Sequence, residues 1–142
     1  MALLTVALSV SFTACSDDDE NAGNDLVSII ASGAWENDGD DDIFVLSKDG
    51  VGFEYTNPAY YKLKRETGCL FTWEYENNIV SIEFAAKYDD GEKTNDRYDY
   101  VELRVISYDR NKIVFKIENS DDNFDNSPCE FENGTWTWTR YR

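Results

Sequence analysis

The sequence contains no histidine. This absence removes the side chain that most often acts as a general base near neutral pH, and the commonest protein ligand for metals. The sequence also lacks a Gly-x-Ser-x-Gly motif, a phosphate-binding loop and a zinc-ligand spacing. The catalytic pattern that remains is a pair of carboxylates for glycoside hydrolysis, from Glu74 with Glu76 or from Glu54 with Glu83. Acids on outward strand faces are ordinary, so we predict no catalytic residue, no cofactor and no enzyme.

Basic residues and prolines are scarce. Thirteen Lys and Arg stand against 29 Asp and Glu, which gives a formal charge of −16. A surface of this charge repels phosphate backbones and anionic headgroups, and therefore excludes nucleic acid as a partner. It favours cations or neutral partners such as glycans. The aromatic content of 15% and the presence of only two prolines indicate a folded domain with an acidic surface.

Residues 1–14 carry no ionisable side chain and form a short apolar segment. The segment is too short to span a bilayer as a helix, which takes about 20 residues, and it fits the apolar region of a secretory leader. The four residues that end it, Phe12, Thr13, Ala14 and Cys15, resemble the lipobox of bacterial lipoprotein precursors, with Phe12 where leucine is more usual. In that family the residue matching Cys15 is acylated on sulfur and becomes the mature N-terminus. The alternative is an ordinary secretory leader followed by an unrelated cysteine.

The acidic run at residues 16–20 is, on physical grounds, a solvated tether that extends by self-repulsion. It also resembles the export signal that follows the lipidated cysteine in surface lipoproteins of Bacteroidota. The resemblance implies a signal peptide at 1–14, a lipidated tether at 15–25 and an outer-membrane lipid anchor through Cys15. The protein would then face the cell exterior, with the periplasmic face of the membrane as the alternative.

Beyond the tether the sequence alternates with the period of β-strands. Segment 26–31 is apolar but too short to separate a helical turn from a strand. Segment 56–68 is expected to be a loop, and 87–97 a polar connection with a turn at 89–91. Eight strands are expected, at about 33–36, 43–46, 51–55, 69–76, 79–84, 98–106, 113–117 and 131–141. Residues 26–142 are thus predicted to form an all-β domain, an eight-stranded antiparallel up-and-down β-barrel, with a β-sandwich as the alternative. The barrel is favoured because closure removes both sheet edges.

Gly33, Ala34 and Trp35, together with the distant Arg140, resemble the lipocalin pattern. The chain is more closely similar to small lipocalin-like lipoproteins of gut Bacteroidota. The resemblance implies that Trp35 lies at the closed end of the barrel with Arg140 stacked across it, a cation–π contact of about 0.5–2 kcal/mol. Both residues are then structural. Vertebrate lipocalins also carry a further motif between the middle strands and a helix before the last strand. Neither is found in this sequence, so the ligand preferences of vertebrate lipocalins are not transferred.

Cys69 and Cys129 remain once Cys15 is lipidated. In an oxidising compartment they are predicted to form a disulfide, worth roughly 4 kcal/mol in the chain-entropy model. Two buried free thiols are the alternative. Asp38, Asp40 and Asp42 alternate as Ca²⁺ ligands often do, but Lys48 stands where a calcium loop of the EF-hand kind needs glutamate. They are therefore weak metal candidates, and a solvated turn is the expected structure.

Four aromatic residues are candidates for ligand binding: Tyr60, Tyr61, Trp73 and Tyr75. Aromatic faces pack on sugar rings and lipid tails, and the mouth of a barrel is a common place for a pocket. The alternative is that Trp73 and Tyr75 only fill the barrel. The sequence thus predicts a surface lipoprotein that binds a small apolar ligand or a glycan. A structural or assembly subunit, whose filled barrel docks a protein partner, is the alternative, and a filled interior would favour it.

Overall fold

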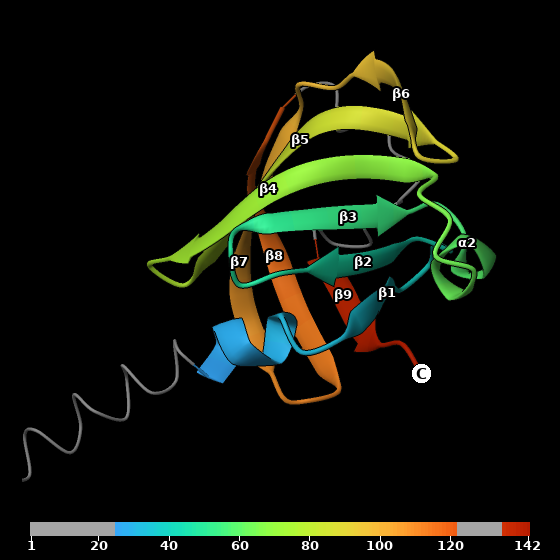
Figure 1. Cartoon of the computed structure of the whole chain (residues 1–142). Helices are drawn as coiled ribbons and strands as arrows, with labels where there is room; N and C mark the ends of the chain where they lie inside the picture. Colours follow the sequence, from blue (N-terminus) through green and yellow to red (C-terminus); the bar gives the residue numbers. More distant parts are fainter. Residues whose placement is uncertain (1–24, 122–134) are drawn as a thin grey trace, which may run out of the picture.

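The computed structural model describes residues 25–121 and 135–142 (Figure 1). Residues 25–30 form a helical turn, and α2 (Pro58–Lys62) is a second short helix. The strands are β1 (Ala34–Asn37), β2 (Ile43–Leu46), β3 (Val51–Tyr55), β4 (Gly68–Glu76), β5 (Ile79–Asp89), β6 (Glu92–Asp96), β7 (Tyr100–Tyr108), β8 (Lys112–Ser120) and β9 (Thr135–Arg140).

Eight of these strands close into a barrel. They follow the order β1, β2, β3, β4, β5, β7, β8 and β9, every pair is antiparallel, and β1 pairs with β9 to complete the ring. β6 lies outside the ring and extends the end of β5 as a hairpin (Figure 1). The predicted up-and-down barrel is confirmed, and the sandwich alternative is wrong because the sheet is closed. Segment 56–68, expected to be a loop, contains the helix α2, and segment 87–97, expected to be a polar connection, contains the end of β5 and the strand β6.

The tight turns follow from residues that tolerate positive φ. Asn77 and Asn78 have φ of 54° and 65° and form the two-residue connection between β4 and β5. This is the pattern of a type I′ hairpin, which matches the twist of the flanking strands. Gly50, with φ of 89°, closes the β2–β3 turn in the same way.

Aromatic side chains fill the middle of the barrel. The ring of Trp138 lies 4.9 Å from that of Phe115, 5.2 Å from that of Phe44 and 6.5 Å from that of Trp35, measured between ring centroids. None of these four residues is more than 1% exposed. Packing of this kind leaves the described interior as a solid core, in which large rings meet at stacked and edge-to-face angles.

The helical turn at 25–30 covers one end of the barrel, which we call the closed end (Figure 1). Leu26 and Ile30 are fully buried in the core. Trp35 Nε1 donates a hydrogen bond to the carbonyl of Ile30 at 2.9 Å. For segment 26–31 the sequence did not decide between a helical turn and a strand, and the structure has a helix at 25–30. Residue 25, which was expected to belong to the tether, is the first residue of this helix.

Arg140 fastens the closed end. Its guanidinium lies 4.0 Å from the centre of the Trp35 ring, the contact that the lipocalin resemblance implies. The same group donates to the carbonyls of Ile29 at 3.3 Å and Arg110 at 2.8 Å. Gly33 leaves the necessary space, since a Cβ there would lie 2.7 Å from Arg140 Nη1. The Gly-x-Trp pattern and the distant arginine thus form one clasp.

Several predictions fall outside the described residues: the signal peptide at 1–14, the lipidation of Cys15, the acidic run at 16–20, and Cys129. In the described part of the chain, every helix is too short or too polar to cross a membrane.

Candidate functional site

Strand β3 turns its less apolar side chains toward the interior of the barrel and its aromatic side chains toward the outside. Gly52 and Glu54 point inward and are buried, while Phe53 and Tyr55 point outward and are half-buried. Gly52 must be inward-facing and small, because a Cβ there would lie 2.2 Å from the ring of Phe71. The consequence is an aromatic surface on the outside of the barrel.

This surface continues as a row of rings in contact. Centroid distances are 6.2 Å from Tyr88 to Phe53, 4.7 Å from Phe53 to Tyr55, 5.6 Å from Tyr55 to Tyr61 and 5.6 Å from Tyr61 to Tyr141. We call these five residues the outer aromatic row. It joins β5, β3, α2 and the C-terminal segment, which lie far apart in the sequence.

α2 brings Tyr61 into the row. Asn57 caps the helix by accepting a hydrogen bond from the Ala59 amide at 2.8 Å, and Pro58 follows in the first turn, where its missing N–H costs nothing. The helix ends at Lys62, with Leu63 as its C-cap. Lys64 follows, and its φ of 54° is the left-handed conformation usual for glycine after a helix. In Figure 1, α2 lies beside the ends of β2 and β3.

The loop that carries α2 is tied to the turn between β5 and β6. The amide of Gly91 donates to the carbonyl of Glu66 at 2.9 Å, and the amide of Asp90 donates to Thr67 Oγ1 at 2.9 Å. Arg65 Nε and Asp90 Oδ1 form a salt bridge of 3.0 Å. These contacts hold α2 in place, so the surface next to it is preformed.

Between α2 and the barrel wall lies an open cleft of about 470 Å³, which we call the tyrosine cleft. Its lining residues are Val45, Tyr55, Tyr61, Lys62, Lys64 and Glu66. Burial, together with Glu66 and Tyr61, raises the pKa of the Tyr55 hydroxyl, which therefore stays a hydrogen-bond donor at physiological pH. The cleft thus combines aromatic faces with ammonium, carboxylate and hydroxyl groups.

The four predicted ligand-binding residues do not form one site. Tyr61 lines the tyrosine cleft, and Tyr60 is its neighbour on α2 with the guanidinium of Arg65 5.6 Å from its ring. Trp73 is only 7% exposed and belongs to the core. Tyr75 packs against the core and donates from its hydroxyl to Asn78 at 3.2 Å.

Trp73 also has its polar group satisfied inside the protein, because its Nε1 donates to the carbonyl of Ser47 at 2.9 Å. Of the four predicted residues, only Tyr61 therefore lines the tyrosine cleft. The alternative, in which Trp73 fills the barrel, describes its position.

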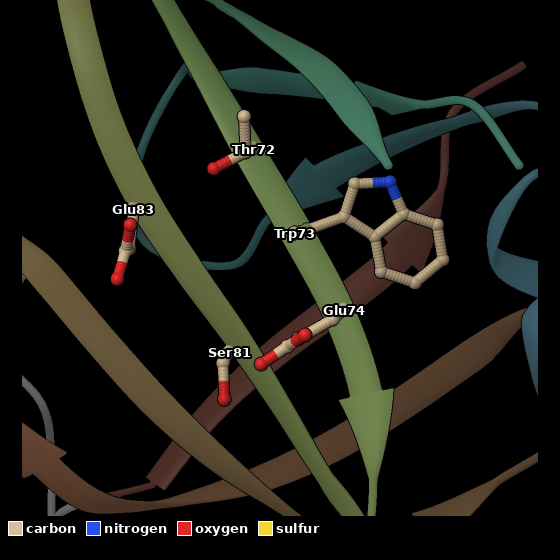
Figure 2. A pocket seen from close by; sticks show the side chains of 5 residues that line it. All are labelled: Thr72, Trp73, Glu74, Ser81 and Glu83. Carbon is tan, nitrogen blue, oxygen red and sulfur yellow. The ribbon is translucent and has the colours of Figure 1, made fainter. Parts of the chain in front are cut away.

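A shallower depression of about 200 Å³ lies on the outer face of β4 and β5 (Figure 2). Thr72, Trp73, Glu74, Ser81 and Glu83 line it, and the indole ring of Trp73 extends to the other side of β4. Glu74 stands opposite Ser81 in the strand register.

The glutamate pairs considered for hydrolysis do not have the expected geometry. Glu54 is buried inside the barrel while Glu83 is exposed outside, so these two lie on opposite sides of the wall. Glu74 and Glu76 point outward on β4, with both side chains exposed.

A buried polar cluster occupies the end of the barrel opposite the helical turn, which we call the open end. Arg97 is its centre: it binds Asp99 through two hydrogen bonds of 2.5 and 2.6 Å and lies 3.9 Å from a Glu54 carboxylate oxygen. Arg97 Nη1 also donates to Cys69 Sγ at 3.1 Å, and its guanidinium lies 3.9 Å from the centre of the Phe84 ring. Glu54, Cys69 and Asp99 are each less than 9% exposed. Arg97 thus offsets part of the negative charge of the carboxylates that the fold buries here.

Asp42 joins this cluster through Glu54. Burial raises its pKa to about 9, helped by the negative charges of Glu54 and Asp40 and by a hydrogen bond to Glu54. Burial also raises the pKa of Glu54, but Arg97 opposes that effect by favouring the carboxylate. We therefore place the shared proton on Asp42, whose protonated carboxyl group donates a hydrogen bond to Glu54. Direct contact is too close for the two carboxyl groups of a glycosidase, which stand about 5 Å or more apart.

The aspartates considered for metal binding separate. Asp38 accepts a hydrogen bond from Thr139 Oγ1 at 2.9 Å, away from the other two. Asp42 turns inward to Glu54 and keeps a hydrogen bond to Asp40, so only two of the three acids stay together. Among residues 25–121 and 135–142, no group of three or more Asp, Glu or Cys side chains is arranged to hold a metal ion. Cys69 is buried and forms no disulfide with a described residue. Its bridge to Cys129 stays a prediction.

Comparisons with protein-family models, with curated proteins and with solved structures find no match for this chain. The fold defines a closed, eight-stranded antiparallel β-barrel with a filled described interior and an external cleft. The function of the protein is therefore inferred from the geometry of the barrel and its cleft.

Sequence reasoning missed most of the tyrosine cleft. Val45 and Tyr55 come from strands, Lys62 ends α2 and Lys64 follows it, so no local motif joins them. Two signals were nevertheless present: Asn57 followed by Pro58 is a helix start, and residues 62–65 hold three basic side chains in an acidic chain.

Proposed function

We propose that the protein is a lipid-anchored, non-catalytic module that binds a saccharide in the tyrosine cleft. The observation that carries this proposal is the preformed cleft itself, with the half-buried rings of Tyr55 and Tyr61 in its wall. Aromatic faces pack on the apolar faces of sugar rings, and the charged and hydroxyl groups beside them offer hydrogen bonds to sugar hydroxyls. A wall held by the loop contacts loses little conformational entropy when a ligand binds.

The filled core bears on the choice of ligand. Rings of Phe44, Phe115 and Trp138 occupy the space in which a carrier would hold an apolar molecule. This packing supports a saccharide over an apolar molecule as the ligand, and we propose a binding surface on the outside of the barrel. Membrane attachment is proposed on the sequence alone, from Cys15 and the acidic run at 16–20.

A glycan array tests the binding proposal, with the full chain purified in detergent. We expect Tyr61→Ala and Tyr55→Ala to reduce retained binding by roughly two- to tenfold, since an aromatic contact contributes about 0.5–1.5 kcal/mol. Tyr98→Ala is the matched control, because Tyr98 is 79% exposed and does not line the cleft. Absence of binding to every saccharide, or equal loss in the control, would contradict the proposal.

Fractionation tests the anchor separately. Cys15→Ala should move the protein from the membrane fraction to the soluble fraction, whereas Cys69→Ala should leave it in the membrane fraction. A Cys15→Ala protein that still sediments with membranes would rule out lipidation at this residue.

The filled core also favours the second candidate, a structural subunit that docks a protein partner. Leu63, 72% exposed at the end of α2, is the side chain best placed for such a contact. Native mass spectrometry of the protein from its own host distinguishes the candidates. A retained saccharide supports the module, while a stoichiometric protein partner lost in Leu63→Asp supports the subunit.

A further inference from the structure

The tyrosine cleft carries a charge opposite in sign to that of the whole chain. Residues 57–66 contain Lys62, Lys64 and Arg65 but a single acid, Glu66, in a protein of net charge −16. At physiological ionic strength charges interact over roughly 8 Å, so a ligand in the cleft experiences this local surface more than the distant acids. The repulsion of anions expected from composition does not apply at this place.

The two lysines are free to meet a ligand. Arg65 is engaged by Asp90 at 3.0 Å, but neither Lys62 nor Lys64 takes part in a salt bridge within the described residues. Lys62 Nζ lies 5.9 Å from the centre of the Tyr141 ring, at the end of the outer aromatic row. Both side chains are on exposed residues that line the cleft.

Lys64 holds its place at a conformational cost. Its φ of 54° is a backbone conformation that glycine or asparagine adopts more easily. The chain nevertheless has a lysine at this position, in the wall of the cleft, which is consistent with a use for its ammonium group.

Resting on the proposed function, we propose that the saccharide is acidic: a sugar ring packs on Tyr55 and Tyr61 while its carboxylate meets the ammonium groups of Lys62 and Lys64. Lysine is a compact point charge with three donors, which suits a single carboxylate. Glu66 in the same wall repels a second anion placed close by. The cleft therefore favours saccharides with a single carboxylate on the bound sugar ring, such as uronates, over sugars that carry several anionic groups on one ring.

Matched ligands isolate the carboxylate. Hexagalacturonate and its fully methyl-esterified form share one backbone and differ in charge, and a hexamer of mannuronate with its methyl ester provides a second pair. Isothermal titration with the full chain in detergent is carried out at about 20 mM and about 200 mM NaCl. We expect the acid of at least one pair to bind about tenfold more tightly than its ester at the lower salt, with that advantage shrinking at the higher salt.

Matched variants assign the effect to the cleft. Lys62→Gln and Lys64→Gln should each weaken binding of the acid about three- to fivefold and leave the ester unchanged, the size typical of an exposed charge pair. Glu66→Gln should strengthen binding of the acid. Lys116→Gln, which removes an exposed lysine of β8 outside the cleft, should change neither ligand.

Each outcome decides between the two proposals. Equal affinity for acid and ester, or binding of only neutral saccharides on the array, overturns the acidic specificity and leaves the saccharide module intact. Absence of binding to every saccharide overturns both. Weakening of the acid by Lys116→Gln as much as by Lys62→Gln also overturns this inference, since the effect would then belong to total charge.

Discussion

At the scale of single residues, the shared proton of Asp42 links stability to pH. The pKa of Asp42 lies at about 9 in the folded chain, against 3.8 for the ordinary group, so the folded state binds the proton more tightly. This contribution to stability is complete below the unfolded pKa and is lost as the pH rises through the folded pKa. The window therefore runs from about pH 4 to about pH 9.

We predict that Asp42→Asn stabilises the protein at high pH. The amide donates to Glu54 without a proton to lose, so the variant should gain on the order of 1 kcal/mol near pH 8.5 after allowance for solvent screening, and little near pH 4. Thermal melts at several pH values measure this. Asp38→Asn makes the same substitution in the same loop, at a residue that contacts Thr139 instead of Glu54, and should not give this gain. Parallel pH profiles for wild type and Asp42→Asn would contradict the prediction.

The clasp at the closed end gives a second residue-scale prediction. Gly33→Ala places a Cβ 2.7 Å from Arg140 Nη1, and the guanidinium moves only by losing its stacking on Trp35. The free energy of unfolding should fall by about 1–2 kcal/mol. In an Arg140→Ala background the same substitution should cost much less, because neighbouring residues are coupled. Urea denaturation of the four proteins in this cycle tests it, and additive effects would refute the clasp.

At the scale of elements, the helical turn at 25–30 acts as a plug for the core. Leu26 is fully buried, so Leu26→Ala should lower the free energy of unfolding by about 2–5 kcal/mol through lost burial and a residual cavity. Ser28→Ala, on an exposed position of the same turn, is the control and should change it by less than about 0.5 kcal/mol. Urea unfolding followed by tryptophan fluorescence measures both. A negligible effect of Leu26→Ala would mean that the turn is not part of the cooperative unit.

The elements also show how far the sequence could be read. Alternation along β4, β5 and β7 predicted strands and their order, because period-two patterning with short turns leaves few topologies. α2 has only five residues, too few for a helical period, and was missed despite its cap. The facing of β3 was not predictable, since Phe53 and Tyr55 are the more apolar pair yet point outward. What forces this is Phe71, a residue of the neighbouring strand, acting on Gly52.

At the scale of the whole molecule, a charge of −16 on a small barrel means self-repulsion in the compact state. Added salt screens that repulsion, so the thermal midpoint should rise by roughly 2–6 °C between about 10 mM and about 300 mM NaCl. KCl should act equally, which separates screening from specific sodium binding. A midpoint that falls with salt would show that the attractive pairs, such as Arg104 with Glu118, outweigh the repulsion.

The position of the helical turn has a consequence for orientation. The helical turn that begins at the exposed residue 25 covers the closed end, and Trp35 and Arg140 hold it there through hydrogen bonds to the carbonyls of Ile30 and Ile29. A lipid tether on the preceding residues would thus suspend the molecule from that pole, with Asp42, Glu54 and Arg97 at the pole farthest from the bilayer. A pulling force on the anchored protein would then act first on the helical turn at 25–30 and on its contacts with Trp35 and Arg140, which would carry the mechanical load.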